Sequence, residues 1–226
     1  MDLHIRPQPT STREAVYDAL KDQILNFDLI PGTSISEKEI ALAFNVSRTP
    51  VRESFLRLAG EGLLDVYPQR GTMVSLIDLS LVEEARFMRE QLECAVISLA
   101  CHQFSKVDIA ELELLLVRQR ASMEAQDNKS MFELDEAFHR TLFTRCSKSN
   151  TWAAMQQMNV HMNRIRKLRL AADHDWQHIY DQHQQMVDSI SRQDEERAVN
   201  LMKDHMNLAI HDERFLREKF PTYFKP

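Results

Sequence analysis

The sequence predicts a mainly α-helical protein in two parts, three helices with a two-stranded hairpin and then an antiparallel bundle of long helices. Two observations predict this division. All four glycines lie in the first third of the 226 residues, the last of them at Gly71. Beyond about residue 76 the chain shows long segments of helical periodicity joined by short polar connectors. We therefore predict domains at residues 1–76 and 77–226.

Capping patterns mark the first two helices. Ser11 with Glu14, and Ser36 with Glu39, each place a hydroxyl three residues before a carboxylate at the start of a helical apolar pattern. The hydroxyl can accept from the backbone N–H of the first turn, and the carboxylate can reach back to the cap. Each pair therefore predicts a helix start.

A third helix is predicted over residues 48–59, with Ser47 as its cap. The side chains expected to face inward are Val51, Phe55, Leu56 and Leu58. Strand-like runs at residues 63–67 and 72–76 flank a turn, which is a hairpin pattern. Three helices followed by a hairpin fit a winged helix-turn-helix.

The remainder of the chain predicts helices only. They are expected over about residues 80–104, 107–126, 130–146, 150–170, 175–191 and 194–220. Ser80 and Ser130, each followed by a glutamate three positions later, are the expected caps of the first and third of these. Long helices with short connectors pack as an antiparallel bundle.

Composition limits the classes of protein to which this chain can belong. No apolar run approaches the ~20 residues needed to cross a bilayer, and the N-terminus has no apolar stretch behind a basic start. The three cysteines include no CxxC pair. These features predict a cytoplasmic protein without membrane contact. The net charge of −6 gives no general affinity for nucleic acid, so DNA binding must depend on where particular cations lie.

The third predicted helix carries a candidate DNA-reading surface. Arg48 and Arg52 are four residues apart and hence on one face, with Thr49 beside them and Val51 on the opposite side. A helix fits the major groove, where arginine can donate two hydrogen bonds to guanine. Ser47 can donate to a phosphate. Spacing alone leaves an ordinary solvated arginine face as the alternative. Further candidate DNA contacts are Lys38 on the preceding helix and Gln69, Arg70 and Gly71 at the hairpin tip.

The stretch Val-Ser-Arg-Thr-Pro-Val-Arg at residues 46–52, together with Pro31-Gly32 before it, resembles the winged helix-turn-helix of the GntR superfamily of bacterial transcription regulators. The resemblance implies operator contacts at Lys38, Ser47, Arg48, Thr49, Arg52 and the wing-tip Gly71. It also implies a regulator and not an enzyme. We expect a homodimer that binds a palindromic operator in double-stranded DNA.

Four side chains in the second part form a candidate metal site. Asp135 and His139 lie one turn apart on the same helical face, and His183 and His205 fall within apolar stripes of two later helices. A buried carboxylate needs a partner or a metal. Three imidazoles and one carboxylate would suit a divalent transition ion. Spacing leaves open the alternative that these are separate core histidines with backbone partners.

The order Asp135, His139, His183 and His205 resembles the FCD-type ligand-binding domain of the FadR subfamily. Members with this set bind a metal that helps to hold a small carboxylate effector. The resemblance therefore implies a divalent transition metal, with Zn expected and Ni, Mn or Fe as alternatives. It also directs Arg89 toward the cavity. Asn163 and Arg166, on a helix expected to line that cavity, are further effector candidates, with ordinary surface positions as the alternative.

Together these features predict a ligand-responsive DNA-binding transcription regulator, with repression expected. Two other classes stay open at this point. A metal-dependent enzyme is one, because His/carboxylate centres also catalyse oxygenation and hydrolysis. No second acid/base set accompanies the site, however, and an enzyme leaves the DNA-reading helix unexplained. The other is a helical interaction protein in which the histidines only pack.

Overall fold

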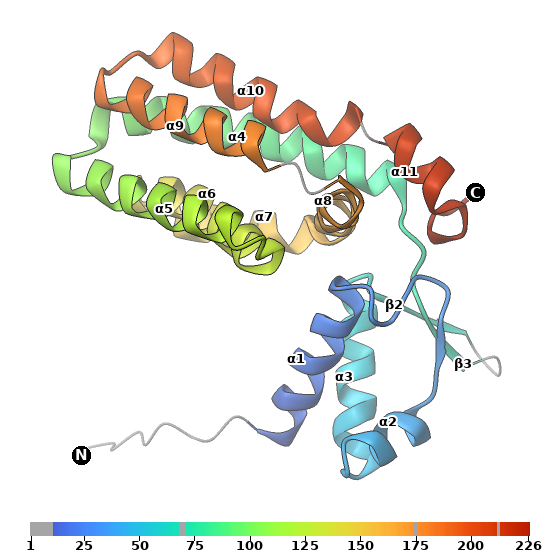
Figure 1. Ribbon diagram of the computed structural model, residues 1–226. Helices are drawn as coiled ribbons and strands as arrows, with labels where there is room; N and C mark the ends of the chain where they lie inside the picture. Colours follow the sequence, from blue (N-terminus) through green and yellow to red (C-terminus); the bar gives the residue numbers. More distant parts are fainter. Residues whose placement is uncertain (1–10, 68–70, 174–175, 212) are drawn as a thin grey trace, which may run out of the picture. The chain divides into compact units, whose positions relative to one another are not determined.

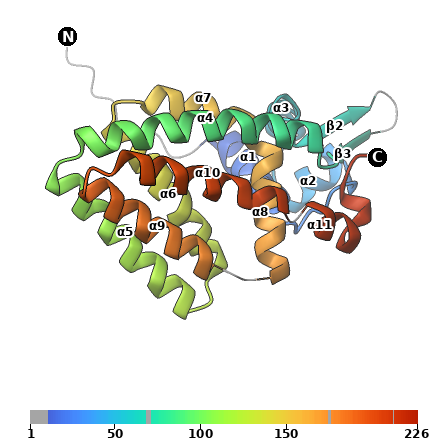
Figure 2. The same ribbon diagram turned by 90° about the horizontal axis from the view of Figure 1, so that it is seen from above.

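The computed structural model describes residues 11–67, 71–173, 176–211 and 213–226 (Figures 1 and 2). The chain divides into two compact units. Unit 1 comprises the chain up to Ile77 together with Phe220–Pro226, and unit 2 is Asp78–Lys219. The structure thus groups residues 220–226 with the first unit, whereas the predicted domains placed them with the helices. The reason is a backbone ladder, since Ile77 N donates to Tyr223 O over 2.8 Å and Lys225 N donates to Ile77 O over 2.9 Å.

Unit 1 has three helices and a small sheet. Its elements are α1 (Thr12–Leu25), β1 (Ser34–Ile35), α2 (Glu37–Ala43), α3 (Arg48–Gly60), β2 (Leu64–Tyr67), β3 (Gly71–Val74) and the short 3-10 helix η1 (Pro221–Tyr223). The antiparallel sheet has the order β1-β3-β2. The predicted hairpin is β2 and β3, while β1, at two residues too short to show an alternating pattern, was not predicted.

The apolar core of unit 1 lies between α1, α3 and the sheet. Val16, Leu20 and Ile24 of α1 are buried, as are Val51, Phe55 and Leu58 of α3. Their spacing is the helical period that the sequence showed. The prediction for Leu56 was wrong, because this side chain is 62% exposed. It is four residues after Arg52, and therefore lies on the solvent face of α3.

Unit 2 is entirely helical. Its elements are α4 (Leu79–Gln103), α5 (Lys106–Glu124), α6 (Asn128–Arg145), α7 (Ser149–Met158), α8 (Val160–Asp173), α9 (Gln177–Ser191), α10 (Glu195–His211) and α11 (Glu213–Lys219). Helix α4 packs against α6, α8, α9 and α10, and α5 packs against α6 and α9. Figure 2 shows α8 lying crosswise to α4 and α10. None of the described helices is long and apolar enough to cross a membrane.

Two predicted helices are divided. The segment predicted as 150–170 is α7 and α8, interrupted at the buried Asn159, and the segment predicted as 194–220 is α10 and α11. Asn159 ends α7, and its carbonyl accepts from Asn163 N over 2.7 Å in the first turn of α8. Apolar periodicity runs through both helices, so it could not show this break.

Two expected caps are displaced. Asp78 caps α4 by accepting from Ser80 N, and Asp127 caps α6 by accepting from Ser130 N. Each aspartate lies two or three residues before the serine that was predicted as the cap, and its charged carboxylate is the stronger acceptor. The pairs Ser11–Glu14 and Ser105–Asp108 do form complete capping boxes.

Candidate functional site

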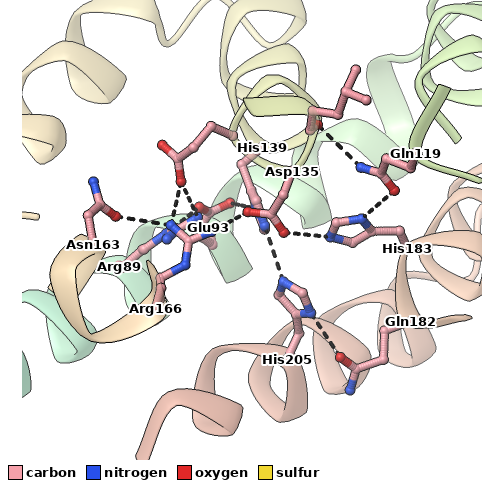
Figure 3. A network of polar contacts seen from close by, with 12 residues as sticks. Arg89, Glu93, Gln119, Asp135, His139, Asn163, Arg166, Gln182, His183 and His205 are labelled. Carbon is pink, nitrogen blue, oxygen red and sulfur yellow. Dashed lines mark hydrogen bonds and ion pairs between the residues drawn. The ribbon is translucent and has the colours of Figure 1, made fainter. Parts of the chain in front are cut away.

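Four buried ligand groups meet between three helices of unit 2. They are Asp135 and His139 on α6, His183 on α9 and His205 on α10. One ligand atom from each lies within 4.8 Å of every other. Figure 3 shows the three imidazoles and the carboxylate directed toward one another. The convergence that helical spacing could not establish is therefore present.

Local geometry explains how these side chains are held. Asp135 and His139 are one turn apart on α6, so both face the same side of the helix. Between them on the chain, Phe138 is fully buried and stacks against the His183 ring, with 4.0 Å between ring centroids. This stacking joins α6 to α9 beside the site.

A separate acceptor holds each imidazole through Nδ1. His139 Nδ1 lies 2.9 Å from Glu93 Oε2, His205 Nδ1 lies 2.8 Å from Gln182 Oε1, and His183 Nδ1 lies 3.1 Å from Gln119 Oε1. Carboxylate and amide oxygens accept hydrogen bonds, so each Nδ1 carries the hydrogen. Each imidazole then presents Nε2 toward the centre, as metal-binding histidines do.

The Nε2 atoms have few partners of their own. His139 Nε2 and His205 Nε2 are 3.2 Å apart, and with hydrogens on both Nδ1 atoms a hydrogen bond between them requires one ring to carry a second hydrogen. Among the described residues His183 Nε2 has no hydrogen-bond partner, and Asp135 Oδ1 is 3.7 Å away. Burial, followed by the charge of neighbouring histidines, holds the pKa of His183 and His205 well below the usual range. Protonation is thus disfavoured, and a cation bound between these atoms would satisfy them.

A small cavity of about 50 Å³ adjoins two of the four ligands, Asp135 and His205. Its wall comprises Arg89, Asp135, Met162, Ile165, Arg166, Arg169, Trp176, Ile179, His205 and Met206. Three arginines against one carboxylate make the polar part of this wall cationic. The remaining lining is largely apolar. Such a cavity accommodates a small anion with an apolar portion.

Arg89 and Arg166 differ in how they are held. Arg89 is buried, and its Nη2 has no hydrogen-bond partner within the described part of the chain. Arg166 is ion-paired with both Asp135 and Glu136 and donates to Asn163 Oδ1 over 3.0 Å (Figure 3). Although burial opposes it, the charges of Arg166 and Arg89 lower the pKa of Glu136 to about 2. Arg89 is therefore the arginine with a buried donor that makes no hydrogen bond to any described residue, although Glu136 Oε1 lies 3.7 Å from it.

The candidate DNA-reading residues of unit 1 are accessible. Ser47, Arg48, Thr49 and Arg52 are all exposed at the start of α3, while Val51 is buried on its inner side. In the chain as described, neither arginine forms an ion pair and the Ser47 hydroxyl makes no capping bond. These polar groups are therefore available for an external ligand.

The structure describes only some of the remaining residues that were predicted to contact DNA. Lys38 on α2 is exposed. Gly71 begins β3 with φ of 95°, a backbone conformation that residues other than glycine rarely adopt. Gln69 and Arg70 lie outside the described residues.

Known proteins resemble both units. Residues 12–74 match the family described as bacterial regulatory proteins, gntR family, and residues 84–208 match the FCD domain. The chain belongs to the GntR family. It is a bacterial DNA-binding transcription regulator, and its FCD domain confirms the predicted FadR-like subfamily.

Relatives of this GntR regulator span almost its whole length. An uncharacterized HTH-type transcriptional regulator in an unstable DNA locus of Streptomyces ambofaciens is 33% identical over 95% of this chain and 90% of its own. The HTH-type transcriptional repressor RspR of Escherichia coli K12 is 29% identical over 99% of each chain. The solved structure of E. coli McbR/YncC shares the fold, with a TM-score of 0.75 and 22% identity over 94% of this chain and 100% of that one. Relatives and fold neighbours are regulators, so we class the chain as a regulator and not an enzyme.

The sequence of this GntR regulator did not predict the residues that hydrogen-bond to the Nδ1 atoms of the three imidazoles. Glu93, Gln119 and Gln182 come from α4, α5 and α9 and are all buried. The sequence contains one signal for these residues: Glu93 lies four positions after Arg89, the arginine predicted to face the cavity. The two glutamines carry no comparable pattern.

Proposed function

We propose that this GntR regulator is a repressor whose operator affinity falls when a small carboxylate binds beside a metal ion in the FCD domain. The observation that carries the proposal is the opposed pair of His139 and His205 Nε2 atoms, 3.2 Å apart, within a group of four ligand residues whose ligand atoms lie within 4.8 Å of one another. A metal ion bound at this point would satisfy both nitrogens.

Asp135, His139, His183 and His205 would hold the ion. Three nitrogen donors and one carboxylate oxygen suit Zn, and the same donor set admits Ni, Mn or Fe. When bound, the ion would supply a positive charge and an open coordination position for an anion. Arg166 already pairs with Asp135, so it orients this carboxylate at the edge of the cavity.

Arg89 would bind the effector. Arg89 lines the cavity, its Nη2 makes no hydrogen bond among the described residues, and an arginine can receive a carboxylate in a two-pronged geometry. The volume of about 50 Å³ favours a molecule of a few heavy atoms. Asn163 and Arg166 would complete the polar wall.

In a homodimer, two copies of α3 would enter successive major grooves of a palindromic operator. Arg48 and Arg52 would read base edges, and Ser47, Thr49, Lys38 and the wing around Gly71 would position the backbone. The name of RspR, a transcriptional repressor, supports repression here. Effector control then requires that the carboxylate bind the DNA-free state more tightly.

Operator release can be tested on the full chain. A binding site is first selected from a random DNA library with the unaltered protein. Small mono- and dicarboxylates are then screened by thermal shift against zinc-loaded and EDTA-stripped protein, because a specific ligand raises the unfolding temperature. We expect a carboxylate that stabilises only the zinc-loaded form and weakens operator binding at least tenfold.

Arg89→Lys should lose this response, and Arg118→Lys on the exposed face of α5 should keep it. The proposal fails if the protein binds no metal, or if a carboxylate that stabilises it leaves operator affinity unchanged.

A further inference from the structure

We infer that Glu93 is a positioning residue that holds His139 in its metal-binding form and joins it to the effector arginine, Arg89. This inference rests on the proposed metal site but concerns a residue outside the four ligands. Glu93 is fully buried on α4. Its two oxygens contact residues of two helices, His139 on α6 and Arg89 on α4 itself.

The first oxygen acts on the metal ligand. Glu93 Oε2 lies 2.9 Å from His139 Nδ1 and, being ionised, can only accept. Glu93 therefore keeps a hydrogen on Nδ1 of His139, and Nε2 faces His205. The other two imidazoles are backed by neutral amides, Gln119 and Gln182. Only His139 has an anion behind it, which makes its Nε2 the most electron-rich of the three donors.

The second oxygen acts on the cavity wall. Glu93 Oε1 accepts from Arg89 Nε over 3.0 Å, one turn away on the same helix. This contact occupies one edge of the guanidinium of Arg89, which lines the cavity, and Nη2 makes no hydrogen bond among the described residues, with Glu136 Oε1 3.7 Å away. Figure 3 shows Glu93 between Arg89 and His139. One carboxylate thus orients both the anion-binding group and a metal ligand.

Charge removal without change of shape tests this role. Glu93→Gln keeps an acceptor oxygen but removes the negative charge, and zinc affinity is measured by competition with a fluorescent chelator. Mutating the residue behind a metal-binding histidine typically weakens metal binding by about 10- to 100-fold, and we expect a loss in that range. The matched control is Glu90→Gln on the same helix, where Arg86 keeps Glu83 as a partner. Its zinc affinity should stay within about twofold of the unaltered protein.

A spectroscopic readout separates positioning from packing and needs no variant. In metal-free protein at alkaline pH, with the imidazoles neutral, ¹⁵N NMR should show the hydrogen of His139 on Nδ1 and not on Nε2. A neutral His139 ring with its hydrogen on Nε2 overturns the inference, even if Glu93→Gln does not fold.

The outcomes distinguish the inference from the proposed function. An unaltered protein that binds no zinc defeats both. Zinc binding that is equally tight in the unaltered protein and in folded Glu93→Gln leaves the metal site standing and defeats the inference about Glu93.

Discussion

His139 and His205 approach each other to 3.2 Å between their Nε2 atoms, although they are 66 residues apart in the chain. Each ring is held from behind, His139 by Glu93 and His205 by Gln182. Neither ring can rotate away without leaving a buried polar group unpaired, which is costly in a protein interior. The packing of α6 against its neighbours therefore keeps two ring nitrogens together, and a cation should stabilise the FCD domain.

Zinc should raise the stability of the metal-free protein. At a zinc concentration a hundred times Kd, mass action predicts about 2.7 kcal/mol in the free energy of unfolding. The double variant His183→Ala with His205→Ala should lose both this gain and bound zinc, measured by thermal unfolding and elemental analysis. His102→Ala, at an exposed histidine of α4, is the control. Undiminished zinc in the folded double variant would rule out the site.

Removal of either recognition arginine should weaken specific DNA binding. Arg48→Ala and Arg52→Ala are each expected to lose about 1–3 kcal/mol of operator binding, because each loses contacts to base edges. Fluorescence anisotropy with the selected operator and with a scrambled duplex measures the specific part. Arg118→Ala, at an exposed position of α5, removes the same charge elsewhere. Full operator affinity in both recognition-helix variants would show that α3 does not read the site.

A partly buried ion pair makes the stability of unit 1 sensitive to acid. Glu61 accepts from Tyr17 Oη over 2.6 Å and from Lys21 Nζ over 2.7 Å. Burial by itself raises the pKa of Glu61, but these two donors outweigh it and the net pKa is lowered. A carboxyl with a lowered folded pKa contributes stability above its unfolded value, near 4.5, and loses it as the pH falls through the folded value.

Glu61→Gln should therefore destabilise unit 1 by about 1 kcal/mol at pH 7 and by much less at pH 3.5. Amide hydrogen exchange of α1 and α3, compared with the unaltered protein at each pH, measures the difference. Glu53→Gln, in an exposed pair with Arg13 at 3.6 Å, should have little effect at either pH. A deficit for Glu61→Gln that is the same at both pH values would contradict the assignment.

The cysteines should be unreactive in the folded protein. Burial raises the pKa of Cys101 and Cys146 to about 11. At pH 8 only about one such thiol in a thousand is the reactive thiolate. Labelling with a disulfide reagent should accordingly be slow in buffer and fast in urea. Rapid labelling of either residue in the native state would show that these thiols are accessible.

Helix positions were predictable because their signals are local. Most starts and ends in unit 2 follow apolar periodicity, and the Ser105–Asp108 capping box is visible in the sequence. The break at Asn159 was not predictable, since apolar residues continue on both sides of it. Pairing of residues 223–225 with Ile77 was also hidden, because a backbone ladder between distant segments has no pattern in either segment.

The amino-acid sequence alone determined that Arg48 and Arg52 share one helical face, because they are one turn apart and the geometry of a single helix fixes their common direction. It also provided the four metal-ligand candidates, but each candidate only as a position on its own helix. The tertiary structure decided that three helices bring them within 4.8 Å and that Glu93 lies behind His139. The physical reason is range: helical geometry acts over a few residues, whereas convergence depends on side-chain packing between helices far apart in the chain.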